Sequence, residues 1–152
     1  MSVEKVLKLI KDEEVKVVDL RFVDLLGTWQ HFSVPAHVIE SDTFTEGLGF
    51  DGSSIRGWQS INESDMLVVP DADSAFLDPF TEVTTLNMVC CILDPITKQP
   101  YPKHPRYIAY KAQEYLKSTG IADTAYFGPE LEFFILDSIR YDIKQNASYY
   151  YL

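Results

Sequence analysis

Hydrophobic residues near the N-terminus recur at the spacing of a helix. Positions i, i+3, i+4 and i+7 of this segment are apolar, so they share one helical face. Ser2 precedes them and can accept a hydrogen bond from the first turn, while Glu4 favours a helix N-terminus through its charge. The pattern therefore predicts a short amphipathic helix whose apolar face comprises Val3, Val6, Leu7 and Ile10.

Two runs rich in β-branched and apolar residues follow and predict a pair of strands. The first run covers residues 15–23, a turn is expected over 24–27, and the returning strand covers 28–34. Pro35 should end this strand because proline cannot donate a backbone hydrogen bond to a neighbour. A short helical piece is expected near residues 36–39.

The pattern breaks down over residues 41–62, which hold four of the seven glycines of the chain. A loop of about 20 residues without secondary structure is uncommon in a compact domain and is often functional. So much apolar surface predicts a loop that docks onto another structure rather than a free linker. The large apolar side chains of this stretch are Phe44, Leu48, Phe50, Ile55 and Trp58.

Regular patterns return in the second half of the chain. Strands are predicted over residues 66–69, 84–93 and 124–136, the last two from runs of β-branched, aromatic and apolar residues. A helix is predicted from Pro105, which suits a first turn, to Gly120, which suits a helix end. These elements indicate an α+β sheet domain over residues 1–103 and the start of a second unit over 104–152.

The chain ends in an apolar cluster, Tyr149-Tyr150-Tyr151-Leu152, although natural domains usually end in polar residues. This ending predicts that the sequence is a truncated piece of a larger protein.

The net charge of −10 argues against nucleic acid or an anionic membrane as the main partner, because both require positive charge. No apolar run approaches the roughly 20 residues that cross a bilayer, and no signal peptide is recognisable. Cys90 and Cys91 are adjacent, so on a strand they point to opposite faces and are expected to be buried free thiols. A cytoplasmic protein is expected.

A first candidate for chemistry is the segment Gly128-Pro129-Glu130-Leu131-Glu132. On a strand, Glu130 and Glu132 would share one face about 6 to 7 Å apart. Two carboxylates placed in this way can hold an oxygen-preferring cation such as Mg²⁺. The alternative is that both glutamates lie on the wet face of a half-buried strand, which is the commoner meaning of such a spacing.

A second candidate is Asp51-Gly52-Ser53-Ser54, inside the glycine-rich stretch. A carboxylate and hydroxyls flanked by glycines could bind an ammonium ion and accept its proton. The alternative is an ordinary Asp-Gly turn, which is the commonest meaning of this dipeptide. The three histidines show no metal-ligand spacing, and surface or capping roles are expected for them.

Several segments in the same order resemble the type I (bacterial) glutamine synthetases. Phe50-Asp51-Gly52-Ser53-Ser54 followed by Asn62-Glu63-Ser64-Asp65-Met66 is similar to an N-terminal signature of that family. Gly128-Pro129-Glu130-Leu131-Glu132-Phe133-Phe134 resembles the family's metal-binding strand. The opening Val17-Val18-Asp19-Leu20-Arg21-Phe22 and the segments Asp78-Pro79-Phe80 and Thr119-Gly120-Ile121-Ala122-Asp123 also fit.

The resemblance implies a β-grasp (ubiquitin-like) N-terminal domain followed by a truncated start of the catalytic α/β domain. It also implies ATP-dependent amidation of glutamate by ammonium to give glutamine, through a γ-glutamyl phosphate and with Mg²⁺ or Mn²⁺. Asp51 matches the residue that binds ammonium and takes its proton, and Ser54 matches a neighbouring substrate-binding residue. Glu130 and Glu132 match metal ligands.

The resemblance further implies a homo-oligomer, a dodecamer of two stacked hexameric rings with each active site between two subunits. One subunit would supply the Asp51 loop, and its neighbour would supply Glu130 and Glu132. The 152 residues alone are then expected to be inactive, because other parts of the site lie outside them. The alternative function is a non-catalytic β-grasp interaction module that docks onto full-length subunits.

Overall fold

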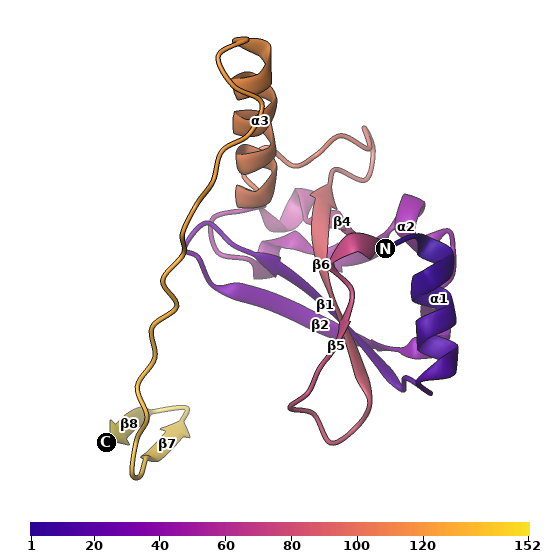
Figure 1. Ribbon diagram of the computed structural model, residues 1–152. Coiled ribbons are helices and arrows are strands. Elements are labelled where there is room, and N and C mark those ends of the chain that lie inside the picture. Colours follow the sequence, from indigo (N-terminus) through magenta and orange to yellow (C-terminus); the bar gives the residue numbers. More distant parts are fainter.

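The first two thirds of the protein form one mixed sheet with its helices, as a computed structural model of residues 1–152 shows (Figure 1). The sheet has six strands. Five follow the order β2-β1-β6-β4-β3, and the sixth, β5, pairs with Leu86 and Asn87 of β6, whereas β4 pairs with residues 90–93 of that strand. The β1–β6 pair is parallel, and all other pairs are antiparallel. The strands are β1 (Val17–Val23), β2 (Trp29–Pro35), β3 (Leu48–Asp51), β4 (Asp65–Pro70), β5 (Phe76–Leu77) and β6 (Thr85–Leu93).

The predicted strand over residues 84–93 is β6, and it lies at the centre of the sheet. Its alternate residues point to one face and are fully buried, as the period of a strand requires. These residues are Leu86, Met88, Cys90 and Ile92. Because β6 pairs with β1, β4 and β5, its apolar face forms the middle of the core.

Helix α1 (Val3–Asp12) confirms the predicted amphipathic helix. The Ser2 side chain accepts a hydrogen bond from the backbone N–H of Lys5 at 3.4 Å, so it caps the first turn as expected. Val6 is fully buried, and Leu7 and Ile10 pack against the core at its margin. The helix therefore covers the sheet with the face that the sequence pattern identified.

The prediction of an irregular docking loop over residues 41–62 is wrong in two respects. The stretch contains a short helix α2 (Thr43–Glu46), the strand β3, and 3-10 turns at Gly52–Ser54 and Ile61–Glu63. Its apolar side chains also pack within the chain, since Ile55 and Trp58 are buried in the core. Glycines hide this order in the sequence because they interrupt the alternation of a strand that has only four residues.

Gly47 shows why a glycine is needed at the entrance to β3. Its φ is +75°, and a Cβ atom there would lie 2.8 Å from the carbonyl oxygen of Val68. A side chain at this position would both strain the backbone and push β3 away from β4.

Helix α3 (Pro105–Ser118) begins at the predicted proline and ends before Gly120, whose φ is +67°. None of its residues is buried. The chain has no helix with both the length and the apolar character needed to cross a bilayer.

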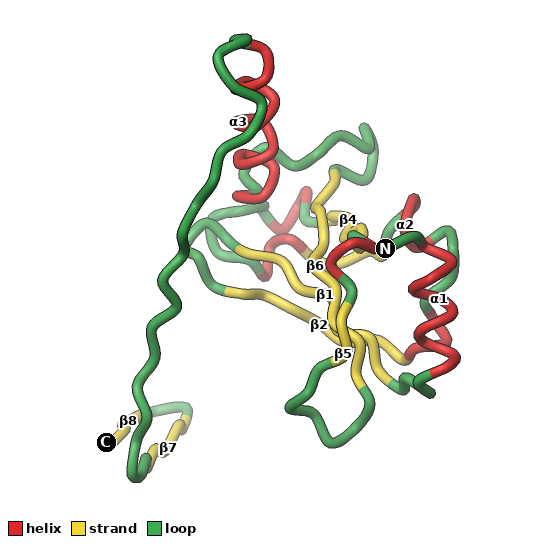
Figure 2. The backbone as a smooth tube through the Cα atoms, viewed as in Figure 1, coloured by secondary structure: helices red, strands yellow, loops and turns green.

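After α3 the chain runs as an extended loop away from the sheet, to a separate hairpin (Figure 2). The hairpin consists of β7 (Arg140–Lys144) and β8 (Ala147–Tyr151), which pair only with each other. The predicted strand over residues 124–136 is wrong, because this extended segment pairs with no other strand. A strand requires a neighbour for its backbone hydrogen bonds, and none lies beside these residues.

The two cysteines lie on opposite faces of β6 and are both free, as predicted. Cys90 is buried, and burial raises the pKa of its thiol well above the usual range. Cys91 is exposed, so the expectation that both thiols are buried is wrong for Cys91.

Candidate active site

The Asp51 carboxylate lies at the exposed end of β3, where the strand turns into the Gly52–Ser54 turn. Its Oδ1 accepts hydrogen bonds from the Ser53 hydroxyl at 2.6 Å and from the Ser53 backbone N–H at 2.8 Å. These bonds hold the pKa of Asp51 below its usual range. The structure therefore presents a fully ionised carboxylate to solvent at neutral pH, with the exposed Ser54 three residues further along.

Gly52 explains why this turn can form next to the core. It is buried, and its backbone N–H donates to the carbonyl oxygen of Ser64 at 2.7 Å. A Cβ atom at this position would lie 2.3 Å from the sulfur of Met66. The Asp-Gly sequence thus forms a turn, and the same turn fixes the position of the Asp51 side chain.

A second carboxylate lies beside Asp51. Asp65 begins β4 and pairs directly with Asp51 in the β3–β4 register. Directly opposed residues of an antiparallel pair share one face, with Cβ atoms about 4.5 to 5.5 Å apart. The end of this hairpin therefore concentrates negative charge, which attracts small cations. The sequence pattern assigns Asp65 no role of its own, and only the register of β3 and β4 reveals its place.

Residues 52–64 connect β3 to β4 and form the Asp51 loop, and Trp58 anchors the middle of this loop in the core. The indole is only 3% exposed, and its ring centroid lies 5.4 Å from that of Phe22 and 5.2 Å from that of Tyr101. The Tyr101 hydroxyl donates to the Trp58 carbonyl oxygen at 2.9 Å. The loop is therefore held at both ends by the β3–β4 pairing and in its middle by the aromatic contacts of Trp58.

His104 does not have the surface role expected for the histidines. It is 1% exposed, lies immediately before α3, and its Nε2 has no hydrogen-bond partner. Burial lowers the pKa of His104 to about 4, and the charge of Arg106 contributes to the same shift. His104 is therefore neutral at pH 7 and packs against Trp58 with ring centroids 6.0 Å apart.

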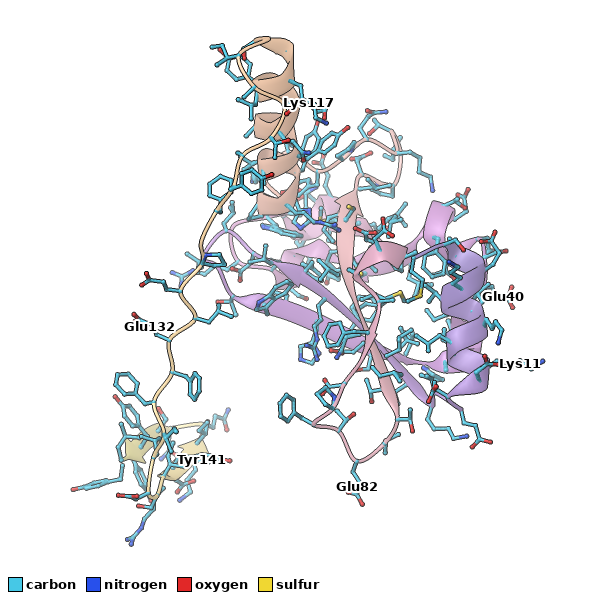
Figure 3. All side chains as sticks on the ribbon, viewed as in Figure 1. Lys11, Glu40, Glu82, Lys117, Glu132 and Tyr141 are labelled. Carbon is cyan, nitrogen blue, oxygen red and sulfur yellow. The ribbon has the colours of Figure 1, made fainter.

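Glu130 and Glu132 both lie on the extended segment after α3, and their side chains are exposed. Figure 3 shows Glu132 on this segment, away from the sheet. The chain contains no group of three or more His, Cys, Asp or Glu residues arranged to hold a metal ion. The structure thus leaves the two glutamates apart from Asp51 and without further ligands.

Comparison with known proteins gives a consistent result along the whole chain. The family model of the glutamine synthetase β-grasp domain matches residues 14–95, and that of the glutamine synthetase catalytic domain matches residues 102–152. The first match confirms the expected α+β, β-grasp architecture of the N-terminal part.

Individual relatives agree with the family models. The chain is 58% identical over 147 residues to a glutamine synthetase of Aquifex aeolicus, covering 97% of this chain and 31% of that protein. It is 55% identical over 150 residues to a glutamine synthetase of Vibrio cholerae, covering 99% of this chain and 32% of the relative. The chain therefore spans about a third of the length of these relatives.

A solved structure shows the same likeness in three dimensions. The cryo-EM structure of a Plasmodium falciparum glutamine synthetase superposes with a TM-score of 0.76 and 27% identity. The superposition covers 99% of this chain and 29% of that one.

Proposed function

This chain belongs to the glutamine synthetase family, and from that premise we propose that the protein carrying it is a glutamate–ammonia ligase. The reaction is the ATP-dependent amidation of glutamate to glutamine through a γ-glutamyl phosphate. The observation that supports it most is the Asp51 loop: an ionised, exposed carboxylate in a chain more than half identical to named glutamine synthetases. The same proposal divides the chain into a β-grasp domain over residues 1–103 and the start of the catalytic domain over residues 104–152.

Asp51 is the residue that binds ammonium and takes its proton. A carboxylate held by Ser53 keeps its negative charge at every physiological pH, so it can attract a small cation. The neighbouring Asp65 adds to this negative potential, and the Ser54 hydroxyl offers a further acceptor. An ammonium ion bound there loses a proton to Asp51 and becomes the neutral nucleophile that amide formation requires.

Glu130 and Glu132 are the residues that would hold a divalent cation, Mg²⁺ or Mn²⁺. Their carboxylate oxygens are the ligand type that such hard ions prefer. Two carboxylates are fewer than the six ligands of an octahedral ion, so water molecules, phosphate oxygens of ATP or further side chains would complete its coordination. The ion, when bound, offsets the negative charge of ATP and of the acceptor carboxylate.

The partners of this proposal are glutamate, ammonium, ATP and further copies of the subunit. Asp51 lies in the sheet domain, whereas Glu130 and Glu132 lie on the extended segment beyond α3. This separation is compatible with an active site formed between two subunits of a ring-shaped homo-oligomer, a dodecamer of two stacked hexameric rings. A cytoplasmic location is part of the proposal.

The test compares this chain with the longest open reading frame that contains it. We expect the longer protein to form glutamine from glutamate, ammonium and ATP, and the 152 residues alone to form none. Asp51→Asn should lower the rate about a hundredfold or more, because the acceptor for the ammonium proton is lost. Glu130→Gln should raise the Mg²⁺ concentration needed for half-maximal activity, because a ligand of the ion is lost. Glu82→Gln, at an exposed loop residue, should change neither the rate nor the Mg²⁺ requirement.

Two results would contradict the proposal. A longer protein without glutamine formation would exclude the ligase, and full activity of Asp51→Asn would exclude the assigned proton acceptor. The second candidate, a non-catalytic module, would bind intact subunits and alter their assembly. Substitution of Asp51 would leave that effect unchanged. The names of the relatives do not favour that candidate.

A further inference from the structure

The segment that joins the sheet domain to α3 forms hydrogen bonds with the Asp51 loop. Tyr101 and Lys103 lie in this segment, between β6 and α3. The Tyr101 hydroxyl donates to the Trp58 carbonyl oxygen at 2.9 Å. The Lys103 ammonium group donates to the same oxygen at 2.9 Å and to the Gly57 carbonyl oxygen at 3.1 Å. Two donors therefore converge on two consecutive carbonyls in the middle of the loop.

Tyr101 is itself fixed to the centre of the sheet. Its backbone N–H donates to the carbonyl oxygen of Ile92 in β6 at 2.8 Å, and its side chain is buried with the residue 6% exposed. Its carbonyl oxygen accepts from the N–H of His104 at 3.1 Å, at the start of α3. The tyrosine thus connects the central strand, the start of α3 and the middle of the Asp51 loop.

The loop needs this support because its own backbone is permissive. Gly57 has φ of +81°, and a Cβ atom at this position would meet only the end of the Leu25 side chain, at 3.7 Å. A glycine can adopt many conformations, so nothing at Gly57 itself confines the chain. Hydrogen bonds to its own carbonyl and to that of Trp58 provide that confinement.

We propose that Tyr101 and Lys103 are positioning residues of the ammonium site, acting through the carbonyls of Gly57 and Trp58 on the loop that carries Asp51. This proposal rests on the proposed function for its catalytic consequence. The loop then depends on the segment that leads into α3, so the start of the second unit helps to set the geometry of the Asp51 carboxylate. The proposed role is indirect, through these two carbonyls, and requires no contact with substrate.

The two donors share one acceptor, which determines the variants to be made. Removing either donor leaves the Trp58 carbonyl with the other, so each single variant should have a small effect. Removing both leaves the carbonyls of Gly57 and Trp58 without these donors, and the effect should exceed the sum of the single effects. The variants are Tyr101→Phe, Lys103→Met and the double variant, with Lys98→Met as the matched control. Lys98 lies in the same segment but pairs with Glu46 instead of the loop.

The first measurement uses the 152-residue chain and does not depend on activity. Hydrogen exchange is compared for the amides of residues 52–58 and for those of β4 and β6. We expect the double variant to exchange faster in residues 52–58 only. In a Trp29→Phe background Trp58 is the single tryptophan, and its emission should move to longer wavelength and become easier to quench. Lys98→Met should behave as wild type.

The second measurement uses the longest open reading frame that contains the chain. The double variant loses three hydrogen bonds to the backbone carbonyls of the loop and should raise KM for ammonium about fivefold, an effect the size of one net hydrogen bond because the contacts act on Asp51 indirectly. KM for ATP and for glutamate should stay unchanged, and kcat should recover at saturating ammonium. A purely structural role would instead move all three KM values or none.

The outcomes separate this proposal from the proposed function. If wild type forms no glutamine, the ligase assignment fails, whereas the exchange measurement still tests the loop contacts. If wild type is active and the double variant loosens the loop without changing KM for ammonium, the positioning role is wrong. Unchanged exchange and fluorescence in the double variant would also overturn it.

Discussion

The two parts of this chain differ sharply in how they use their apolar residues. All 24 buried residues lie between Val6 and His104, and residues 105–152 contain none. The second part is nevertheless rich in large apolar side chains that are at least 80% exposed. These residues are Ile121, Tyr126, Phe127, Leu131, Phe133, Phe134 and Ile135. Equally hydrophobic sequence therefore forms a core in one part and an exposed surface in the other.

The difference shows that a hydrophobic pattern specifies a core only when its partners are present. In the first part, β6 pairs with β1, β4 and β5, so their apolar residues join in one buried core. In the second part, the segment after α3 pairs with no strand, and the β7–β8 hairpin stands apart from the sheet (Figure 1). The sheet domain should therefore account for the cooperative unfolding of the chain, and residues 105–152 should contribute little to it.

The largest expected effect comes from a matched pair of leucine substitutions. Leu20 in β1 is fully buried, whereas Leu131 is 90% exposed. Leu20→Ala should lower the free energy of unfolding by about 2 to 5 kcal/mol, because it removes buried methyl groups and leaves a cavity. Leu131→Ala should change it by less than about 0.5 kcal/mol. Urea unfolding followed by circular dichroism measures both.

Equal losses in the two leucine variants would contradict the comparison, since they would show that residue 131 also belongs to a cooperative core. A large loss in Leu20→Ala with no change in Leu131→Ala would support it.

A smaller effect is expected where the two parts meet, at His104. Burial lowers its folded pKa to about 4 from an ordinary value of 6.5. Between these two pH values the unfolded chain binds a proton that the folded chain does not, so stability falls as the pH falls. The loss across this window should be about 2 to 3 kcal/mol.

The measurement is the free energy of unfolding at several pH values for wild type and for His104→Phe, which keeps an aromatic ring against Trp58. The variant should lose most of the slope between pH 6.5 and 4. Asp19 and Asp78 have folded pKa values below the usual range, so their stabilising effect is lost only at still lower pH. An unchanged slope in His104→Phe would mean that His104 is not the titrating group.

Local signals predicted the elements whose causes are local. Ser2 and the apolar spacing after it predicted α1, and Pro105 with Gly120 predicted the limits of α3. The dense run of β-branched residues predicted β6. The Asp51 turn could also be predicted, because an Asp-Gly pair forms a turn wherever its carboxylate can accept nearby N–H groups.

Signals that depend on distant partners were missed or misread. The strand β3 exists because β4 pairs with it, and its glycines hide the alternation that a strand usually shows. For the same reason Asp65 could not be placed beside Asp51 without the register. The segment around Glu130 has the composition of a strand, but composition cannot supply the neighbouring strand that its backbone requires.

The smallest expected effect concerns the ion pair that joins α3 to the sheet domain. Arg106 in the first turn of α3 donates to the Asp71 carboxylate, in the turn after β4. Burial, the largest single influence, would raise the pKa of Asp71, but the hydrogen bonds from Arg106 and the Asp73 backbone, together with the charges of Arg106 and the N-terminus, outweigh it and the pKa is lowered. Both side chains are about a third exposed, so Asp71→Asn should cost only about 0.5 kcal/mol, and less at high salt.

The same substitution should loosen α3 more than it destabilises the sheet. Hydrogen exchange in residues 105–118 should accelerate in Asp71→Asn, while exchange in β6 stays as in wild type. Glu114→Gln is the matched control, because it removes an ion pair with Lys117 that lies entirely within α3. If Glu114→Gln accelerates exchange as much as Asp71→Asn does, helix propensity and not the contact with the sheet controls α3. If only Asp71→Asn does so, α3 is ordered through its junction with the sheet domain, the same junction that holds the Asp51 loop.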